Sequence, residues 1–152
     1  MQVVYLADCP QYITVLAKWC HEQWGYLNPN RTLAEVEINF SELLNLDRIP
    51  FALVVIDGGK AIAMASLDLQ DMDVYPDLTP WLASVYVVPA HRKKGIGSKI
   101  VKAVLEKAKQ HHVKKVYFFT MDQEHWYAKM GFQVLQKTNY HNEDVTVMVL
   151  DF

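Results

Sequence analysis

Two glycines and a group of basic residues stand directly before the most regular amphipathic stretch of the chain, in the segment HRKKGIGSKI at residues 91–100. The first turn of a helix carries N–H groups without intrahelical partners, and the helix dipole adds positive charge there. Gly95 and Gly97 would let an anion approach this backbone closely, and the three basic residues before them add charge. The segment therefore predicts a binding site for a phosphate or a pyrophosphate.

Two other phosphate-binding glycine patterns do not fit this segment. A P-loop reads GxxxxGK[ST], and the chain contains no such string. A dinucleotide fingerprint reads GxGxxG tight against a strand, whereas Ile100 stands at the third glycine position and Gly95 follows Val88 by seven residues. Taken alone, the two glycines are also compatible with a purely structural corner between a strand and a helix.

A second motif makes the signal more specific. VYVVPAHRKKGIG, from Val85 to Gly97, resembles the acyl-CoA signature of the GNAT superfamily of N-acetyltransferases, an apolar strand followed by [QR]-x-x-G-x-[GA] at the start of a helix. Arg92, Gly95 and Gly97 occupy its three defining positions. Downstream, WYAKMGF at residues 126–132 resembles the aromatic-Tyr-x-Lys-apolar-Gly-Phe segment of that superfamily. The two motifs fall at the expected separation, and the order of elements along the whole chain fits too.

The resemblance implies how acetyl-CoA would be held, and it implies no metal. In this superfamily the fourth and fifth strands begin parallel and then splay apart, and the pantetheine arm of CoA enters between them. By analogy, Val85 and Val87 would offer main-chain groups to that arm, and the Val87 amide would polarise the thioester carbonyl. The residues implied at the phosphates are Arg92, Lys93, Lys94, Gly95, Ile96, Gly97 and Ser98.

Transfer of an acetyl group to an amine needs deprotonation of the amine, donors for the developing oxyanion and a proton for the departing thiolate. Tyr127 matches the position from which members of the superfamily often donate that proton, and a phenol with a pKa near 10 is protonated at neutral pH. Its alternative role is packing under the fifth strand. The base stays open: it is a water relay or one of the carboxylates Glu22, Asp68, Asp71, Asp73, Asp122 and Glu124.

The first half of the chain predicts a strand, two helices and a hairpin. Val3–Leu6 is typical of a strand, and capping boxes that begin at Asp8 and Thr32 predict two helices, the first of them running through about Glu22. Gly58–Gly59 separates two apolar runs and suits the positive φ angles of a tight hairpin turn.

The second half predicts a parallel βαβ unit and a final pair of strands. Residues 81–88 form an apolar run, and the spacing of apolar residues 100–108 predicts an amphipathic helix. Residues 116–120 are expected to form a short strand that is covered on both faces. A brief helix ending at Gly131 precedes two alternating strands. The sequence thus predicts one mixed α/β domain (an α+β mixed sheet) over residues 1–152, with about seven strands, four helices and splayed central parallel strands.

The charge is distributed unevenly along the chain. Residues 92–115 contain nine Lys and Arg against one Glu, whereas residues 35–77 contain nine Asp and Glu against two basic residues. Two solvated faces would explain this asymmetry, and so would a basic site for an anion and an acidic site for a cation. The pI of about 6.3 and the absence of Phe, Tyr and Trp from residues 92–115 argue against nucleic-acid binding.

The remaining features indicate a cytoplasmic globular protein. The chain is 51% hydrophobic and 21% charged, and no apolar run approaches the roughly 20 residues that a membrane span needs. The N-terminus lacks the basic and apolar regions of an export signal. Cys9 and Cys20 form no CxxC motif and are expected to remain free.

The sequence therefore predicts an acetyl-CoA-dependent N-acetyltransferase, an acyltransferase in which a primary amine of a small cationic molecule attacks the thioester directly. The alternative is a catalytically silent CoA-binding sensor or interaction domain. The expected partner is the small-molecule amine, with neither nucleic acid nor a membrane. A homodimer is compatible with the resemblance, because homodimers are frequent in the superfamily.

Overall fold

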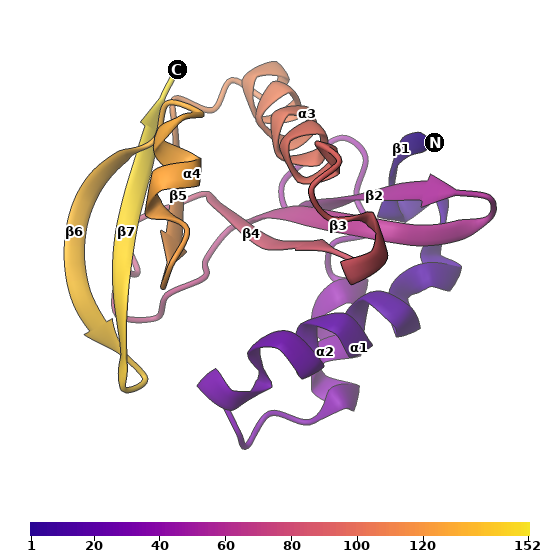
Figure 1. Ribbon diagram of the computed structural model, residues 1–152, viewed down its shortest axis with the longest axis horizontal. Helices are drawn as coiled ribbons and strands as arrows, with labels where there is room; N and C mark the ends of the chain where they lie inside the picture. The colour runs from indigo at the N-terminus through magenta and orange to yellow at the C-terminus, as the bar shows by residue number, and fades with distance from the viewer.

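A mixed seven-stranded sheet runs through the centre of the protein in the computed structural model, which describes residues 1–152 (Figure 1). In chain order the strands are β1 (Gln2–Tyr5), β2 (Phe51–Asp57), β3 (Lys60–Asp68), β4 (Trp81–Val87), β5 (Lys115–Thr120), β6 (Gln133–Tyr140) and β7 (Glu143–Asp151). They lie in the order β1-β2-β3-β4-β5-β7-β6, and all neighbours are antiparallel except β4 and β5, which run parallel. The predicted fold class and strand number are confirmed.

Helices cover both faces of this sheet (Figure 1). The α-helices are α1 (Ile13–Trp24), α2 (Leu33–Ser41), α3 (Ile96–Gln110) and α4 (Glu124–Ala128). On one face, α1 and α2 enclose a core that includes Leu16, Val36 and Val54. On the other face, α3 buries the apolar stripe at residues 100–108 against β2, β3 and β4, so the predicted amphipathic helix is confirmed.

The first helix begins later than the sequence suggested. Asp8 lies inside a short 3₁₀ turn, and a second 3₁₀ turn at Pro10–Tyr12 precedes α1, which has no side-chain cap. The prediction of a capping box at Asp8 is therefore wrong. The physical reason is Pro10, because the residue before a proline avoids the helical region, and Cys9 accordingly has φ −143° and ψ 57°.

Two other local predictions are confirmed. Thr32 caps α2, and its Oγ1 atom accepts a hydrogen bond of 3.2 Å from the main-chain N–H of Glu35. Gly58 and Gly59 form the turn between β2 and β3 with φ angles of 58° and 77°. Both features depend on contacts within a few residues, which is why the sequence was sufficient to predict them.

The strand β5 is less buried than the sequence suggested. Val116 and Thr120 are buried, but the three aromatic residues between them keep part of their surface exposed. The Phe118 ring packs against Tyr127, whereas the next ring, that of Phe119, packs against Trp81 on the opposite face. Both faces of β5 are therefore covered, as predicted, but the aromatic residues remain only partly buried.

Both cysteines are free thiols, as expected; Cys9 is buried and Cys20 is partly buried. None of the helices has both the length and the apolar character that crossing a lipid bilayer requires.

Candidate active site

The central parallel strands β4 and β5 touch only where they begin. Trp81 is paired with Tyr117, and the Tyr117 N–H donates a hydrogen bond of 3.0 Å to the Pro80 carbonyl. Beyond this point the register between β3 and β4 shifts, and Ser84 adopts a left-handed conformation with φ 53°. A bulge of this kind bends its strand, and Figure 1 shows β4 diverging from β5. The predicted splay is confirmed.

The splay leaves main-chain polar groups of β4 directed into the gap. The Val88 N–H donates to the Ile62 carbonyl of the neighbouring chain segment at 2.9 Å. Because hydrogen bonding alternates along an antiparallel strand, Val87 directs its own N–H and carbonyl away from β3. Val85 lies where the register shifts and has no paired residue on β3. These are the two residues for which the resemblance implied main-chain contacts with a ligand.

The loop between β4 and α3 has the backbone conformation of an anion cradle. Gly95 is the residue before the helix and has φ +80° and no side-chain cap, so the N–H groups of the first turn keep no partner from a capping side chain. Lys93 is also left-handed, with φ +63°. A Cβ atom on Gly97 would lie 3.6 Å from the Val87 side chain and 3.8 Å from Trp126, which is ordinary contact. The conformational requirement for glycine therefore falls on Gly95.

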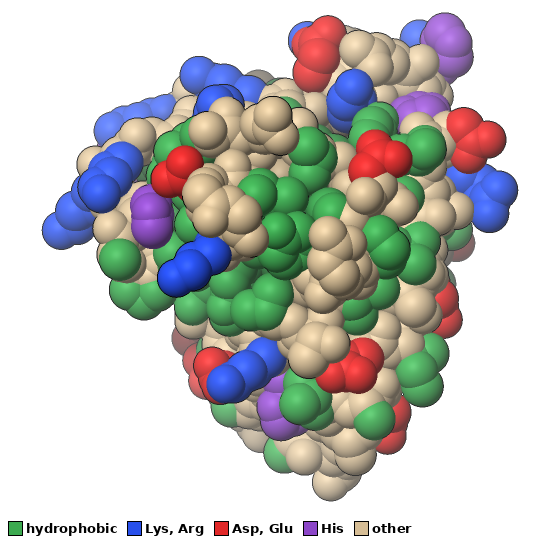
Figure 2. Space-filling model, turned by 90° about the vertical axis from the view of Figure 1, so that its right-hand side faces the viewer, with side chains coloured by type: hydrophobic (Ala, Val, Ile, Leu, Met, Phe, Trp, Pro, Cys, Tyr) green, Lys and Arg blue, Asp and Glu red, His purple; other side chains and the backbone are tan.

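Arg92 connects this loop to β4. Its Nε–H donates a hydrogen bond of 2.8 Å to the Val87 carbonyl, and its guanidinium carbon lies 5.4 Å from the centroid of the Tyr86 ring. This side chain therefore fixes the loop against the strand. The charge around the loop is carried by the exposed Lys93 and Lys94. Figure 2 shows Lys and Arg side chains gathered toward the upper left of the face that it draws.

A cleft of about 460 Å³ lies between these elements. It is lined by most of the residues singled out from the sequence: Val85, Val87, Arg92, Lys93, Gly95, Ile96, Gly97, Ser98 and Tyr127. Lys94 belongs to the same loop but does not line the cleft. Both motifs of the sequence thus meet at one cavity, although 28 residues lie between Ser98 and Tyr127 along the chain.

Tyr127 borders the cleft from α4 and is 4% exposed. Its ring centroid lies 3.9 Å from that of Phe118 and 5.8 Å from that of Phe132. Burial raises the pKa of its phenol well above the ordinary value of 10.0, so the hydroxyl keeps its proton throughout the neutral range. The side chain therefore packs against β5, which was its alternative role. Because its hydroxyl keeps its proton near pH 7, it can also act there as a proton donor.

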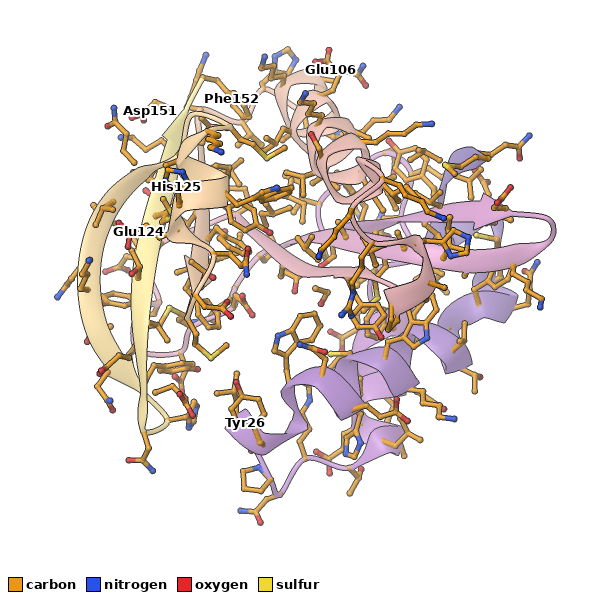
Figure 3. The ribbon with its side chains drawn as sticks, in the orientation of Figure 1. Tyr26, Glu106, Glu124, His125, Asp151 and Phe152 are labelled. Carbon is orange, nitrogen blue, oxygen red and sulfur yellow. The ribbon has the colours of Figure 1, made fainter.

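Most of the carboxylates considered as a base lie on the surface. Glu22 is exposed, 4.0 Å from Lys18, and Asp122 is exposed as well. Glu124 faces the outer strands, where its Oε2 atom lies 3.5 Å from Lys137 Nζ and accepts a hydrogen bond from Thr146; Figure 3 shows it on that side. Asp73 is exposed and accepts a hydrogen bond of 3.2 Å from the Tyr140 hydroxyl.

Asp68 and Asp71 differ from these four. Asp68 stands at the end of β3, its Oδ1 atom is buried, and this atom has no hydrogen-bond partner. Burial raises the pKa of Asp68 to about 6 against weaker opposing effects of Ser66 and Arg31. Burial and then the Asp68 charge raise the pKa of Asp71 to about 8. The two carboxyls therefore titrate together across neutral pH.

Several cleft residues were given no role in the sequence analysis, although Tyr86, His91 and Trp126 lie within the two motifs. Tyr86 lies between the two valines of β4 and turns its ring to α1, where it stacks on Trp19 at 5.1 Å and meets Trp24 edge-on at 6.4 Å. Gln23, Trp24, His91, Gln123 and Trp126 also line the cleft. Alternation along β4 could have predicted the direction of Tyr86, but the contribution of α1 needed the tertiary structure. No group of three or more His, Cys, Asp or Glu residues is arranged to hold a metal ion.

Comparison with known families agrees with this geometry. The family model described as "Acetyltransferase (GNAT) family" matches residues 14–132, which include both motifs and the whole β4-α3-β5 unit. The chain belongs to the GNAT acetyltransferase family. A comparison of the sequence with curated proteins gave no significant match.

Solved structures of GNAT proteins share the fold over nearly the whole chain. The ribosomal-protein-alanine N-acetyltransferase from Brucella melitensis has a TM-score of 0.75 at 18% identity and covers 100% of both chains. The aminoglycoside 6'-N-acetyltransferase from Enterococcus faecium has a TM-score of 0.74 at 14% identity, covering 99% of this chain and 97% of the other. An aminoglycoside 6'-N-acetyltransferase complexed with coenzyme A has a TM-score of 0.75 at 14% identity with the same coverage. At these identities the likeness concerns the fold.

The raised carboxyl pKa values predict a pH-dependent stability. Asp68 and Asp71 bind protons more tightly in the folded protein than in the unfolded chain, where the ordinary pKa is 3.8. Their contribution to the free energy of unfolding is therefore complete below about pH 4 and is lost as the pH rises through about 6 and 8. We expect Asp71→Asn to gain stability relative to the wild type over this range, by at most about 1.4 kcal/mol per pH unit.

Thermal and urea unfolding at pH values from 4 to 9 would measure this difference. Asp77→Asn is the matched control, because Asp77 is an exposed residue of the same loop. Parallel pH profiles for the wild type and Asp71→Asn would contradict the coupling between the two buried carboxyls.

Proposed function

We propose that the protein transfers an acetyl group from acetyl-CoA to a primary amine of a small, cationic molecule. The observation that carries the proposal is the single cleft at which the anion cradle before α3, the free main-chain groups of β4 and the Tyr127 hydroxyl meet. Family membership supports acetyl transfer in general. The donor is inferred from the residues that line the cleft, and the acceptor class from carboxylates that lie outside the cleft lining.

The residues around the cleft fit the chemistry of CoA. A diphosphate needs several N–H donors that converge without intervening side chains, and the loop from Lys93 to Ser98 offers them at the positive end of α3. An extended arm that carries amides needs partners of the kind found in a sheet. Val85 and the Val87 N–H would offer them, while the Val87 carbonyl already accepts a hydrogen bond from Arg92. A similar fold has been solved with coenzyme A, which supports this donor.

Carboxylates lie near Tyr26, in the region that we take as the acceptor side. Tyr26, at the end of the helical pair α1–α2, reaches across to Met121 after β5, with its hydroxyl 3.0 Å from the sulfur (Figure 3). The pKa of Tyr26 is raised by partial burial and then by the charges of Glu143 and Asp122. The buried pair Asp68 and Asp71 adds to this negative character. A cationic acceptor is favoured by such surroundings, and aminoglycoside acetyltransferases are among the proteins of similar fold.

Acetyl-CoA supplies an activated acyl thioester, and the chain supplies orientation and protons. The loop before α3 would hold the phosphate end, and the Val87 N–H, which points away from β3, would stabilise negative charge on the thioester oxygen. Arg92 keeps the loop and the strand at a fixed separation through the Val87 carbonyl. Tyr127, protonated at neutral pH because it is buried, donates a proton to the departing sulfur.

Acetyl transfer to a panel of amines tests the proposed function. Release of free CoA thiol would be followed with acetyl-CoA and primary amines that differ only in their remaining charge: cationic, neutral and anionic. We expect cationic amines to give the highest kcat/KM, because carboxylates surround the acceptor side. Acetyl-CoA that protects the protein thermally while no amine reacts would instead indicate the silent CoA-binding domain, and a preference for anionic amines would contradict the acceptor class.

Replacement of Gly95 tests the cradle. Alanine has no easy access to φ +80°, and holding it there costs about 1–2 kcal/mol, so we expect Gly95→Ala to raise the Kd for CoA by about tenfold. Gly58→Ala is the matched control, because Gly58 is also left-handed, has equally free space around its Cβ position and lies in the distant β2–β3 turn. Titration calorimetry with CoA gives both values, and equal Kd values for the two variants would exclude the cradle.

Replacement of Tyr127 tests the proton donor. Phenylalanine keeps the packing against Phe118 and Phe132 and removes only the hydroxyl, so we expect Tyr127→Phe to lower kcat by about 100-fold and to change the Kd for acetyl-CoA less than about twofold. Tyr117→Phe is the control, since Tyr117 packs on Trp81 and does not line the cleft. An unchanged kcat between pH 6 and 9 would leave Tyr127 with a packing role alone.

A further inference from the structure

The carboxylates that could take a proton from the acceptor amine fall into two groups. Four of the six candidates are on the surface or engaged by other side chains, as described above. Asp68 and Asp71 alone combine a shielded carboxyl with a second carboxyl close enough to influence its charge. A buried carboxylate oxygen without a partner, such as Asp68 Oδ1, is costly in a folded protein, and such groups are commonly retained where they act.

We infer that Asp68 and Asp71, acting as one carboxyl pair that shares a proton, accept the proton that the acceptor amine loses before it attacks. The inference rests on the proposed acetyl transfer and names the proton acceptor of that same site. The position of the pair supports it. Asp68 stands at the end of β3, opposite Trp81, the residue at which β4 and β5 part.

The pair is also connected to the cleft through α1. Besides burial, the charges of both carboxyls raise the pKa of Cys20. The Cys20 thiol lies against the Ser84 side chain in the β4 bulge, next to the cleft residue Val85. A cavity of about 30 Å³, enough for one water molecule, is lined by Cys20, Arg31 and Trp24, and Trp24 also lines the main cleft. The pair is thus near enough to α1 to act on Cys20, beside the β4 bulge that precedes the cleft residue Val85.

The charges that face the pair keep it at one negative charge near pH 7. Arg31, before α2, is the cation that acts on both carboxyls, and Cys20 of α1 is a thiol whose pKa burial raises to about 11, so it is neutral. The Tyr140 hydroxyl of β6 donates a hydrogen bond to Asp73. Besides burial, the charge of Asp71 also raises the pKa of Tyr140, so Tyr140 stays protonated. One basic group cannot compensate two buried carboxylates, so one of the two holds a proton and the other is free to take one.

These residues account for every proton that moves during the transfer. The ammonium group of the acceptor gives one proton to the ionised carboxylate of the pair, which leaves a neutral amine. The amine nitrogen forms the C–N bond to the acyl carbon and the C–S bond breaks. The sulfur takes the Tyr127 proton, and the second proton of the nitrogen returns to Tyr127. The pair then releases its extra proton to water, which restores the starting state.

A matched pair of acceptors tests the inference. The best diamine from the panel would be compared with its aminooxy counterpart, in which the reacting CH₂–NH₂ group is replaced by O–NH₂, a nucleophile that is uncharged at pH 7 and needs no deprotonation. We expect Asp68→Asn and Asp71→Asn to lower kcat/KM about 100-fold for the diamine and less than about threefold for the aminooxy compound. The loss with the diamine should shrink toward pH 9.5, where more of the amine is neutral.

The ratio of the two acceptors within one variant does not depend on the folded fraction, so partial unfolding cannot imitate the result. Asp73→Asn is the control, since Asp73 is exposed and bonded to Tyr140. Equal losses for both acceptors in Asp68→Asn and Asp71→Asn, or no loss, would overturn the inference while acetyl transfer itself stands. A wild-type protein that acetylates neither acceptor would overturn the proposed function first.

Discussion

The interrupted hydrogen bonding between β4 and β5 determines where the other parts of the site can lie. The two strands are paired at Trp81 and Tyr117 and then separate, so the later residues of β4 keep main-chain groups that no strand satisfies. A sheet normally completes such bonds. The bulge at Ser84 and the bond from Arg92 to the Val87 carbonyl hold the open arrangement, and they leave the Val87 N–H directed into the cleft.

Apolar packing on both sides compensates for this opening. The helix α3 spans β2, β3 and β4 with its buried stripe, and α4 brings Tyr127 against Phe118 of β5. Each half of the divided sheet therefore has its own packing: a cluster around Trp81 and Val147 fills the outer face of β5 and β7, while α1 and α2 cover β2 and β3. A rigid frame on each side allows the gap to persist, because closing it would require both cores to shift.

Opposite charges occupy the two ends of the site. The start of α3 presents N–H groups and lysines, whereas the far side presents Asp68, Asp71, Asp122 and Glu143 with Arg31 as the cation that acts on the buried pair. Shielded carboxyls lower the stability of the folded protein at neutral pH. This energetic cost distinguishes Asp68 and Asp71 from the exposed acids. Of these four acids, Asp68 and Asp71 belong to the acidic segment 35–77 of the sequence, whereas Asp122 and Glu143 come from the second half of the chain.

The sequence by itself determined features that depend on near neighbours: the glycine turn at 58–59, the Thr32 cap, the amphipathic stripe of α3 and the two motifs that identify the family. It failed at Asp8, where Pro10 overrides a capping pattern. Only the tertiary structure decided which of the six carboxylates are shielded enough for their pKa values to rise, because shielding and charge interaction arise when β3, α1 and the segment before α2 come together from distant parts of the chain.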